Sequence, residues 1–347
     1  MPVVEAAALS TLTFELCRAS GSPETEAKLV SGRLVKANLT GHDSHGVARL
    51  ELYMRRLKEG KLRPGAKMSV LRENDVTAQV SGNWGYGQVG ASQAMEYAIG
   101  KAREHSLSMV GLREVNHIGR RSDYVVSAAS EKMVALMMTN AGGFSKLVAP
   151  AGGRTRRLST NPIAAAFPSR CEFPVVIDMA TSCVSEGKVA YWRDSDTPAP
   201  DNTLLDATGQ PTNRAADFYE GGSILPIGGA FAYKGFILNF MIEVLAGILT
   251  GAGCLREDVD RFSNGSLIIV IDIEEFRSLK SFTEELDELI DYIKVSPRAA
   301  DEQILCPGEK EALIEKERLV TGIDIPEPTW RELQGLCVEF GVSTENY

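Results

Sequence analysis

Sequence motifs that pair cysteines are missing from this chain. Its six cysteines include no C-x-x-C and no local pairing pattern, and it has only four histidines. Such usage favours ordinary thiols in a reducing compartment over a disulfide scaffold or a zinc cage. His42 and His45 stand three residues apart, but no carboxylate or cysteine cluster completes a set of ligands, so no metal site is expected.

Targeting and membrane-spanning segments are also missing. The amino-terminal stretch MPVVEAAALSTLTFELCRASG has no basic region, and no apolar run approaches about 18 residues. The sequence therefore predicts a cytoplasmic protein with no membrane partner.

Positive charge is in deficit. The chain has 37 Lys and Arg against 46 Asp and Glu, which gives a net charge of −9 and disfavours a nucleic-acid partner. An acidic protein can still enclose a basic pocket, so an anionic small-molecule substrate stays open. The chain also has neither a P-loop nor a G-x-S-x-G motif, which argues against phosphoryl and acyl transfer.

The order of hydrophobic patterns predicts an α/β protein with two lobes. At 347 residues the chain is long enough for more than one core. We expect residues 1–70 and 308–347 to form a helical lobe, and residues 71–307 to form an α/β region. Within that region, strands are expected at 76–80, 107–112, 134–139, 174–177 and 267–273, and helices at 88–105, 122–132, 185–193, 234–249 and 282–294.

Two segments of the α/β region carry further expectations. Residues 234–249 are apolar on nearly all sides of a helix, so this helix is expected to be buried. Residues 197–227 hold Pro198, Pro200, Pro211 and Pro226 with several glycines, which predicts extended loops.

The segment Thr40–Gly60, TGHDSHGVARLELYMRRLKEG, combines an apolar stripe with reactive side chains. Read as a helix that starts near Ser44, with Ser44 or Asp43 as its N-cap, it places four polar side chains on one face. Spacing alone favours an amphipathic helix with a solvated polar side over a substrate site. The polar face would carry His45, Arg49, Tyr53 and Arg56.

Two further motifs follow predicted strands. Gly85–Gly90 fits G-x-G-x-x-G, and Glu114 lies near the position of a ribose-binding acid, as in a Rossmann fold. The preceding strand, VTAQV, is polar at alternate residues, which argues against a central parallel strand. His117 lies in Asn-His-Ile-Gly, on a loop after a strand, where ligands of α/β sheets collect.

Several loops rich in small and polar residues are candidates for binding phosphate or ribose. Asn140 is followed by Ala-Gly-Gly, the run 158–162 reads LSTNP, and Asp178 ends a strand just before Thr181. Lys188 and Lys234 follow in small-residue settings where a lysine can meet a phosphate. Each of these signals also occurs in ordinary loops.

Taken together, these strings resemble one known family. DSHGVARLELYMRRL, EVNHIG, VAPAGGRTRRLSTNPIAAAFPS, VVIDMATS, SEGKV, AYKGF, CPGEKE and GIDIPEPTW occur in one order along the chain. They are similar to the malate/L-lactate dehydrogenases that are distinct from the Rossmann-type enzymes. Members of that family include 2-hydroxy acid, ureidoglycolate and sulfolactate dehydrogenases and cyclic imino acid reductases.

The resemblance implies a non-Rossmann α/β fold with a mixed sheet, a cofactor that is NAD or NADP, and a homodimer with its active site near the subunit interface. It therefore argues against Gly85–Gly90 as the cofactor loop. The matching motifs imply catalytic Ser44, His45 and His117, and substrate-binding Arg49 and Tyr53. The implied cofactor residues are Asn140, Ser159, Thr160, Asn161, Asp178, Thr181, Lys188, Lys234, Pro307, Gly308 and Glu309.

One departure from the family pattern lies at Ala230–Lys234. Where many members read GGHKGYG, this chain reads GGAFAYKGFIL, with Tyr233 in place of the histidine. The departure leaves open the details of substrate choice and phosphate contact near Lys234.

The function that the resemblance implies is hydride transfer between NAD(P)H and a 2-oxo acid, with a histidine moving the proton. We expect Arg49 to hold the substrate carboxylate, because its planar fork binds carboxylates bidentately. A histidine suits this proton transfer because imidazole titrates near neutral pH. His45 is the first choice for that role and His117 is the second. A cyclic imino acid reductase is the alternative, and a non-catalytic NAD(P)-binding dimer is a remote one.

Overall fold

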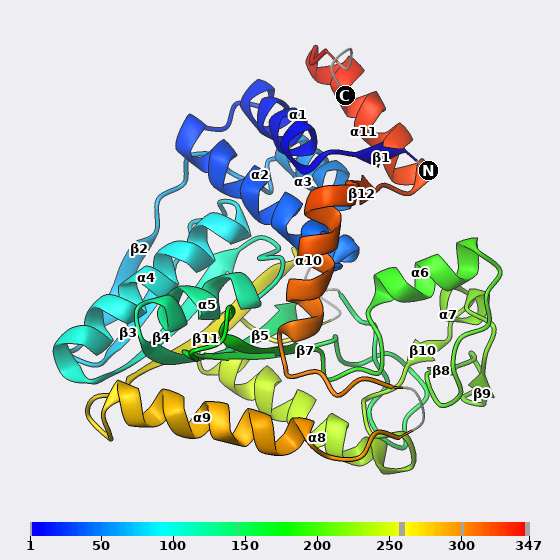
Figure 1. Ribbon diagram of the computed structural model, residues 1–347. Helices are drawn as coiled ribbons and strands as arrows, with labels where there is room; N and C mark the ends of the chain where they lie inside the picture. The colour runs from blue at the N-terminus through cyan, green and yellow to red at the C-terminus, as the bar shows by residue number, and fades with distance from the viewer. Residues whose placement is uncertain (1, 144, 257–260, 300–301, 344–347) are drawn as a thin grey trace.

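A mixed seven-stranded sheet forms the centre of the molecule in the computed structural model, which describes residues 2–143, 145–256, 261–299 and 302–343 (Figure 1). Among the described strands, β3 and β4 pair in parallel and the other neighbours pair antiparallel. The expected mixed α/β fold is confirmed, and it differs from a parallel Rossmann sheet. In spatial order the strands are β2 (Ser69–Glu73), β3 (Thr77–Ser81), β4 (Leu107–Val115), β11 (Ser263–Asp272), β5 (Met133–Gly142), β6 (Ile163–Phe167) and β7 (Val175–Met179).

Burial explains why these strands differ in sequence. β11 lies between β4 and β5, and its apolar run from Leu267 to Val270 is largely buried. β3 lies next to the edge strand, where Ala78 and Val80 are buried while Thr77 is exposed. The alternating pattern of VTAQV therefore reflects a strand with one well-covered face.

Helices cover both faces of the sheet. The buried side chains of Met95, Leu112 and Ile268 pack together between the helices and the strands on one face. This core holds the end of β4 in place and so fixes the start of the loop that carries His117. The helices are α4 (Gly87–His105) and α5 (Ser122–Ser130) on that face, and α8 (Ala232–Ile242), its π-helical continuation (Glu243–Ile248) and α9 (Leu279–Lys294) on the other (Figure 1).

Both ends of the chain build one helical lobe, as expected (Figure 1). Val3–Val4 (β1) pairs antiparallel with Ile323–Asp324 (β12), ahead of the first helix. The boundaries at residues 70 and 308 stay predictions. The helices of the lobe are α1 (Ala6–Ala19), α2 (Glu24–Leu39), α3 (Leu50–Lys58), α10 (Glu309–Thr321) and α11 (Glu327–Phe340).

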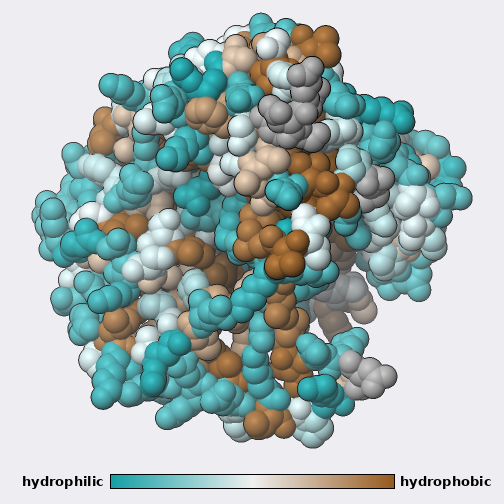
Figure 2. All heavy atoms as spheres, turned by 45° about the horizontal axis from the view of Figure 1, so that its top comes forward, coloured by the Kyte–Doolittle hydropathy of each residue, from teal (hydrophilic) through white to brown (hydrophobic). Residues whose placement is uncertain are grey.

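The surface of the helical lobe is mostly polar, with apolar patches. Figure 2 turns this lobe toward the viewer and shows brown apolar patches among teal polar side chains. The large apolar side chains exposed on α10 and α11 are Leu313, Leu319, Val320 and Val338.

Residues 197–227 are more ordered than their prolines and glycines predict. A three-stranded sheet of order β10-β8-β9 lies in this segment, next to α6 and α7 (Figure 1). The expectation of loops alone is wrong because short strands close hairpins around the buried side chains of Leu204, Phe218 and Ile224. The elements are α6 (Glu186–Asp194), β8 (Leu204–Leu205), β9 (Pro211–Thr212), α7 (Ala216–Tyr219) and β10 (Ser223–Ile224).

The apolar helix α8 is not buried on all sides, contrary to expectation. Ile242 and Ala246 pack on the sheet with Met138 and Leu267. The other side exposes large apolar side chains, among them Ile237 at 59% and Phe240 at 57%. By length and composition, the described helical stretch of residues 229–248 is also long and apolar enough to cross a membrane, which is weak evidence for a membrane span. The sequence predicts no such segment, because no apolar run approaches about 18 residues.

Candidate active site

The segment around Ser44 forms two tight turns instead of the start of one helix. Asp43–His45 and Val47–Arg49 are 3₁₀ turns, and α3 begins only at Leu50. Gly46 between them is extended, with ψ −152°, and a Cβ there would lie 2.1 Å from Asn38 Oδ1. The expected helix start and N-cap are therefore wrong: Asn38 Oδ1 accepts from the Val47 N–H at 2.9 Å, and Asp43 pairs with Arg318.

The two tight turns bring His45 beside His117. Their rings are stacked, with centroids 5.2 Å apart and planes inclined by 21°. His117 comes from the loop that follows β4. The sequence predicted both residues for the site, and the structure brings them together from segments far apart in the chain.

A hydrogen-bonded chain behind His117 fixes the orientation of its ring. Gln88 Nε2 donates to the Tyr53 hydroxyl at 2.6 Å, and that hydroxyl lies 2.8 Å from His117 Nδ1. With the amide donating to its oxygen, the phenol proton is directed to Nδ1, which places the proton of neutral His117 on Nε2. Tyr53 is fully buried and does not line the cavity described below, so it positions His117 from behind.

Burial and neighbouring cations keep both histidines neutral. Burial lowers the pKa of His45 well below 6.5, with further lowering from Arg121 and Arg49. Burial likewise lowers the pKa of His117 well below 6.5, followed by the charges of His45, Arg49 and Arg56. Near pH 7 each imidazole therefore has one proton to give and one lone pair to accept another.

His45, His117, Ser44 and Arg49 line one cavity of about 430 Å³. Arg49 Nε donates to the Ser44 carbonyl at 2.6 Å, and no described carboxylate pairs with its guanidinium. The start of α6 closes one side, since a Cβ on Gly187 would lie 2.7 Å from Ser44 Cβ. The cavity therefore combines neutral imidazoles with a cation that lacks a protein counter-ion.

Three of the expected cofactor residues line the same cavity. Ser159 and Thr160 reach it from the loop before β6, and Asn140 from β5. The Asn140 side chain is already engaged: it donates to the Gly253 carbonyl at 2.9 Å and accepts from the Gly265 N–H at 3.0 Å. Ser159 and Thr160 are therefore better placed than Asn140 to meet a ligand.

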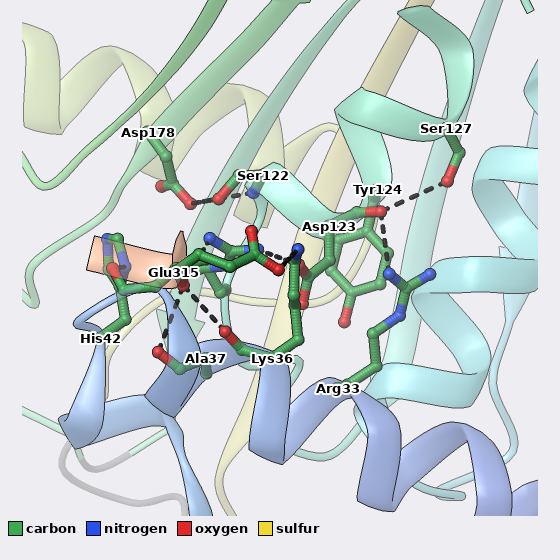
Figure 3. Close-up of polar contacts among 12 residues, drawn as sticks. Arg33, Lys36, Ala37, His42, Ser122, Asp123, Tyr124, Ser127, Asp178 and Glu315 are labelled. Carbon is green, nitrogen blue, oxygen red and sulfur yellow. Dashed lines mark hydrogen bonds and ion pairs between the residues drawn. The ribbon is translucent and has the colours of Figure 1, made fainter. Parts of the chain in front are cut away.

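A second, larger cavity of about 1,040 Å³ lies on the other side of the loop 119–122. Figure 3 shows side chains that line it, among them His42, Ser122 and Glu315. Gly119 and Arg121 line the smaller cavity, whereas Arg120 and Ser122 line the larger one. Of the expected cofactor residues, this larger cavity holds Asp178, Pro307 and Gly308.

Asp178 lies in the wall between the cavities and is held by several donors. Its carboxylate accepts from Arg121 Nη2 at 2.8 Å and from the Ser122 N–H and Oγ at 2.9 Å each, the last two shown in Figure 3. Burial acts to raise the pKa of Asp178, but the charge of Arg121 and these hydrogen bonds outweigh it and lower the pKa to about 2. The carboxylate is thus ionised and anchors the wall.

The other expected cofactor residues do not line either cavity. Asn161 and Thr181 are buried and hydrogen-bonded within the protein, Asn161 to Asn239 and Thr181 to Thr160. Glu309 pairs with Lys294. Lys188 and Lys234 are exposed and lie over aromatic rings. The departure at Ala230–Lys234 falls in the 3₁₀ turn before α8 and in its first turn, where Phe231 is 60% and Tyr233 is 50% exposed.

Sequence reasoning missed Gln88, Arg121 and Arg156 as residues of this region. Gln88 was visible inside the glycine motif Gly85–Gly90, whose role here is packing: a Cβ on Gly87 would lie 2.3 Å from the His117 carbonyl oxygen. Arg156 lies in a quoted string and Arg121 lies two residues after another, but neither had a spacing that marked it. Among the described residues, no group of three or more His, Cys, Asp and Glu could hold a metal ion.

Comparison with known proteins places this site in a family. Residues 4–334 match the sequence model described as malate/L-lactate dehydrogenase. The chain is 36% identical over 331 residues to malate dehydrogenase of Pyrococcus horikoshii, covering 93% of this chain and 91% of that protein. It is 33% identical over 341 residues to L-sulfolactate dehydrogenase of Methanocaldococcus jannaschii, covering 97% and 96%.

Solved structures agree with the sequence match. A putative malate/lactate dehydrogenase from E. coli superposes with a TM-score of 0.94 at 31% identity and covers 99% of this chain and 97% of that chain. A Δ1-piperideine-2-carboxylate reductase from Pseudomonas syringae gives a TM-score of 0.83 at 26% identity, with coverage of 97% and 100%. The resemblance drawn from the motifs is confirmed: this chain belongs to the malate/L-lactate dehydrogenase family and is an oxidoreductase of the non-Rossmann type.

Proposed function

We propose that this protein uses NAD or NADP to interconvert a small 2-hydroxy acid and its 2-oxo acid. The cavity in which His45, His117 and Arg49 meet carries this proposal. A group that moves a proton and a fork that holds a carboxylate are what reduction of a 2-oxo acid requires. Relatives named malate and sulfolactate dehydrogenases support the same class of substrate.

The two cavities fit a dinucleotide cofactor. A buried nitrogen without a described hydrogen-bond partner lies beside each of them: His45 Nδ1 at the smaller cavity and Arg120 Nε at the larger. Such atoms are expected to find a partner in a ligand. A bound nicotinamide would supply or accept the hydride. Ser159 and Thr160 would hold that end of the cofactor, and Pro307 and Gly308 the other, beside the wall that Asp178 anchors.

His117 is the better placed of the two histidines to move the proton. The hydrogen bonds from Gln88 to Tyr53 and from Tyr53 to His117 set the tautomer of His117. Its Nε2–H can therefore be given to the substrate oxygen as the carbonyl carbon is reduced. His45, the first choice from the sequence, stacks on His117 and remains the second candidate. Ser44, which lines the same cavity, would donate a hydrogen bond to the substrate oxygen.

Arg49 would bind the carboxylate next to the reacting carbon. Its Nε is committed to the Ser44 carbonyl, which fixes the plane of the guanidinium and leaves its two amino groups for a bidentate contact. A fixed carboxylate orients the adjacent carbonyl toward the histidines, and this alignment supplies part of the rate.

Oxidation of NADH and of NADPH, followed by absorbance, tests this function. We expect turnover with at least one member of a panel of 2-oxo acids that includes pyruvate, oxaloacetate and 2-oxoglutarate, and cofactor binding in the absence of substrate. Turnover of piperideine-2-carboxylate alone would favour the imino acid reductase. Cofactor binding without turnover of any of these acids would favour the non-catalytic protein, and no cofactor binding would contradict both.

We further propose that the exposed side of α8 forms the interface of a homodimer in the cytoplasm. Ile237, Phe240 and Met241 of α8 and Phe231 in the 3₁₀ turn before it are each more than 40% exposed. Exposed apolar side chains gathered in this way are typical of subunit interfaces. α8 also reaches the active site, since Asn239 Nδ2 donates to the Ser159 carbonyl at 2.7 Å. An interface on α8 would therefore lie beside the smaller cavity.

Replacing both Ile237 and Phe240 with glutamate is expected to convert the dimer to a monomer, because two carboxylates would have to be buried against apolar surface. Light scattering after size-exclusion chromatography measures the mass. Val338→Glu is the matched control, because Val338 is 85% exposed on the helical lobe and its variant should stay dimeric. A wild-type monomer, or wild-type protein recovered only with membranes, would contradict the interface.

A further inference from the structure

The smaller cavity is strongly basic although the protein is acidic. Of the described residues that line it, four are arginines and one is a glutamate: Arg49, Arg56, Arg121, Arg156 and Glu186. Asp178 neutralises Arg121 from behind the wall. More positive charge therefore faces the cavity than one substrate carboxylate can balance.

Arg156 is held rigidly without an acidic partner. Its Nε donates to the Gly222 carbonyl at 2.6 Å, and its Nη2 donates to the Phe218 carbonyl. The guanidinium lies 3.9 Å from the centre of the Phe218 ring. No ion pair or hydrogen bond within the described residues uses its Nη1. This is a fixed cation with donor capacity to spare.

Arg49 and Arg156 reach the cavity from different segments of the chain. Arg49 donates to the Ser44 carbonyl, next to His45, whereas Arg156 is held by the carbonyls of Phe218 and Gly222. Tyr219 Oη donates to Glu186 Oε1 at 2.9 Å, so that carboxylate already has a partner. From Glu186 the wall continues through Gly187 to Ser44. Arg49 and Arg156 therefore serve different parts of one cavity.

We propose that Arg156 binds a second anionic group of the substrate, so that the enzyme prefers 2-oxo acids with two acidic groups to those with one. The inference rests on the proposed function: Arg49 holds the carboxylate next to the reacting carbon, and Arg156 holds the distal carboxylate or sulfonate. A substrate with a single carboxylate leaves the cation of Arg156 without a partner in a confined site, which weakens its binding.

Arg156→Gln tests the proposal in steady-state kinetics with two substrates. We expect KM for oxaloacetate to rise about 10- to 100-fold, the range for a lost charge-assisted hydrogen bond, while pyruvate, already a poor substrate, changes little. Arg156→Lys keeps the positive charge but loses the planar guanidinium, so its KM for oxaloacetate should lie between those of the wild type and Arg156→Gln. Arg154→Gln is the matched control, because Arg154 is exposed in the same segment and does not line the cavity. Arg49→Lys should weaken both substrates alike.

Three results would overturn the proposal. One is a wild-type enzyme that reduces pyruvate as efficiently as oxaloacetate. Another is an Arg156→Gln variant that loses both substrates equally while its melting temperature is unchanged. The last is a variant that loses NADH affinity in a fluorescence titration without substrate, which would assign Arg156 to the cofactor. In each case the proposed function would still stand.

Failure of the proposed function gives a different result. If the wild type reduces neither acid, the affinities for malate and lactate, measured by calorimetry, test the second anion site instead. Malate binding that exceeds lactate binding and is lost in Arg156→Gln would support the second anion site. Equal or absent binding of the two acids would overturn it.

Discussion

Replacing His117 with glutamine is expected to lower kcat by about 10²- to 10⁴-fold, the usual contribution of a general acid or base. The amide keeps much of the size and polarity of the ring, so the variant isolates proton transfer from packing. KM for the 2-oxo acid should change less, because Arg49 still holds the carboxylate. Single-turnover oxidation of NADH by the purified variant measures the effect on chemistry alone.

Tyr53→Phe provides the comparison that separates positioning from catalysis. It removes the hydroxyl that sets the His117 tautomer but leaves the ring that packs edge-on against Tyr86, at 5.9 Å between centroids. A loss of about 10- to 100-fold in kcat is expected, as for other partners that orient a reactive histidine. If His117→Gln stays near wild-type activity while His45→Gln loses it, the proton belongs to His45.

The same histidines predict the pH profile of hydroxy acid oxidation. A base must be neutral to accept a proton, and burial lowers both pKa values well below 6.5. The ratio kcat/KM should therefore stay level as the pH falls through 6.5 and decrease only below it. A half-maximal rate near pH 6.5 would contradict the burial of these rings.

Asp178→Asn is expected to destabilise the fold by about 3–5 kcal/mol, because it leaves the buried cation of Arg121 uncompensated. Urea unfolding at pH 7 measures the change. Glu327→Gln removes one partner of an exposed pair with Arg331 and should cost less than about 1 kcal/mol. A loss that small for Asp178→Asn would show that water or a ligand stabilises Arg121 instead.

The stabilisation of the fold by Asp178 also depends on pH. The pKa of Asp178 is lowered from 3.8 to about 2 in the folded protein, so the unfolded chain takes up this proton first as the pH falls. The stabilisation is fully present above pH 4 or so and is lost progressively as the pH falls toward about 2. In Asp178→Asn this part of the acid unfolding should disappear.

The residues of the catalytic end could be predicted because their motifs are local. Ser44, His45 and Arg49 lie within one short string, and His117 lies in another that follows a clear strand. The backbone conformation of the segment around Ser44 was predicted wrongly. A helix from Ser44 satisfies the periodicity, but the amide of Asn38 binds the Val47 N–H and packs against Gly46, which only a folded α2 can arrange.

The partners of buried polar groups could not be predicted, because they depend on distant segments. Asp178 and Asn161 stand in strings typical of ligand loops, yet Arg121 and Asn239 hold their side chains. The sequence also could not show that one side of α8 is exposed. An apolar helix has the same composition whether its partner is the core of its own chain or a surface outside it.

The pairing of β1 with β12 makes the catalytic turn depend on a segment that is synthesised much later. Val4 pairs with Ile323, and Arg318 of α10 binds both the Asn38 carbonyl and Asp43, next to Ser44 and His45. A chain still emerging from the ribosome can build its sheet before this lobe is complete. Contacts between such distant residues form late, so the growing polypeptide carries no finished active site until α10 and β12 have been made.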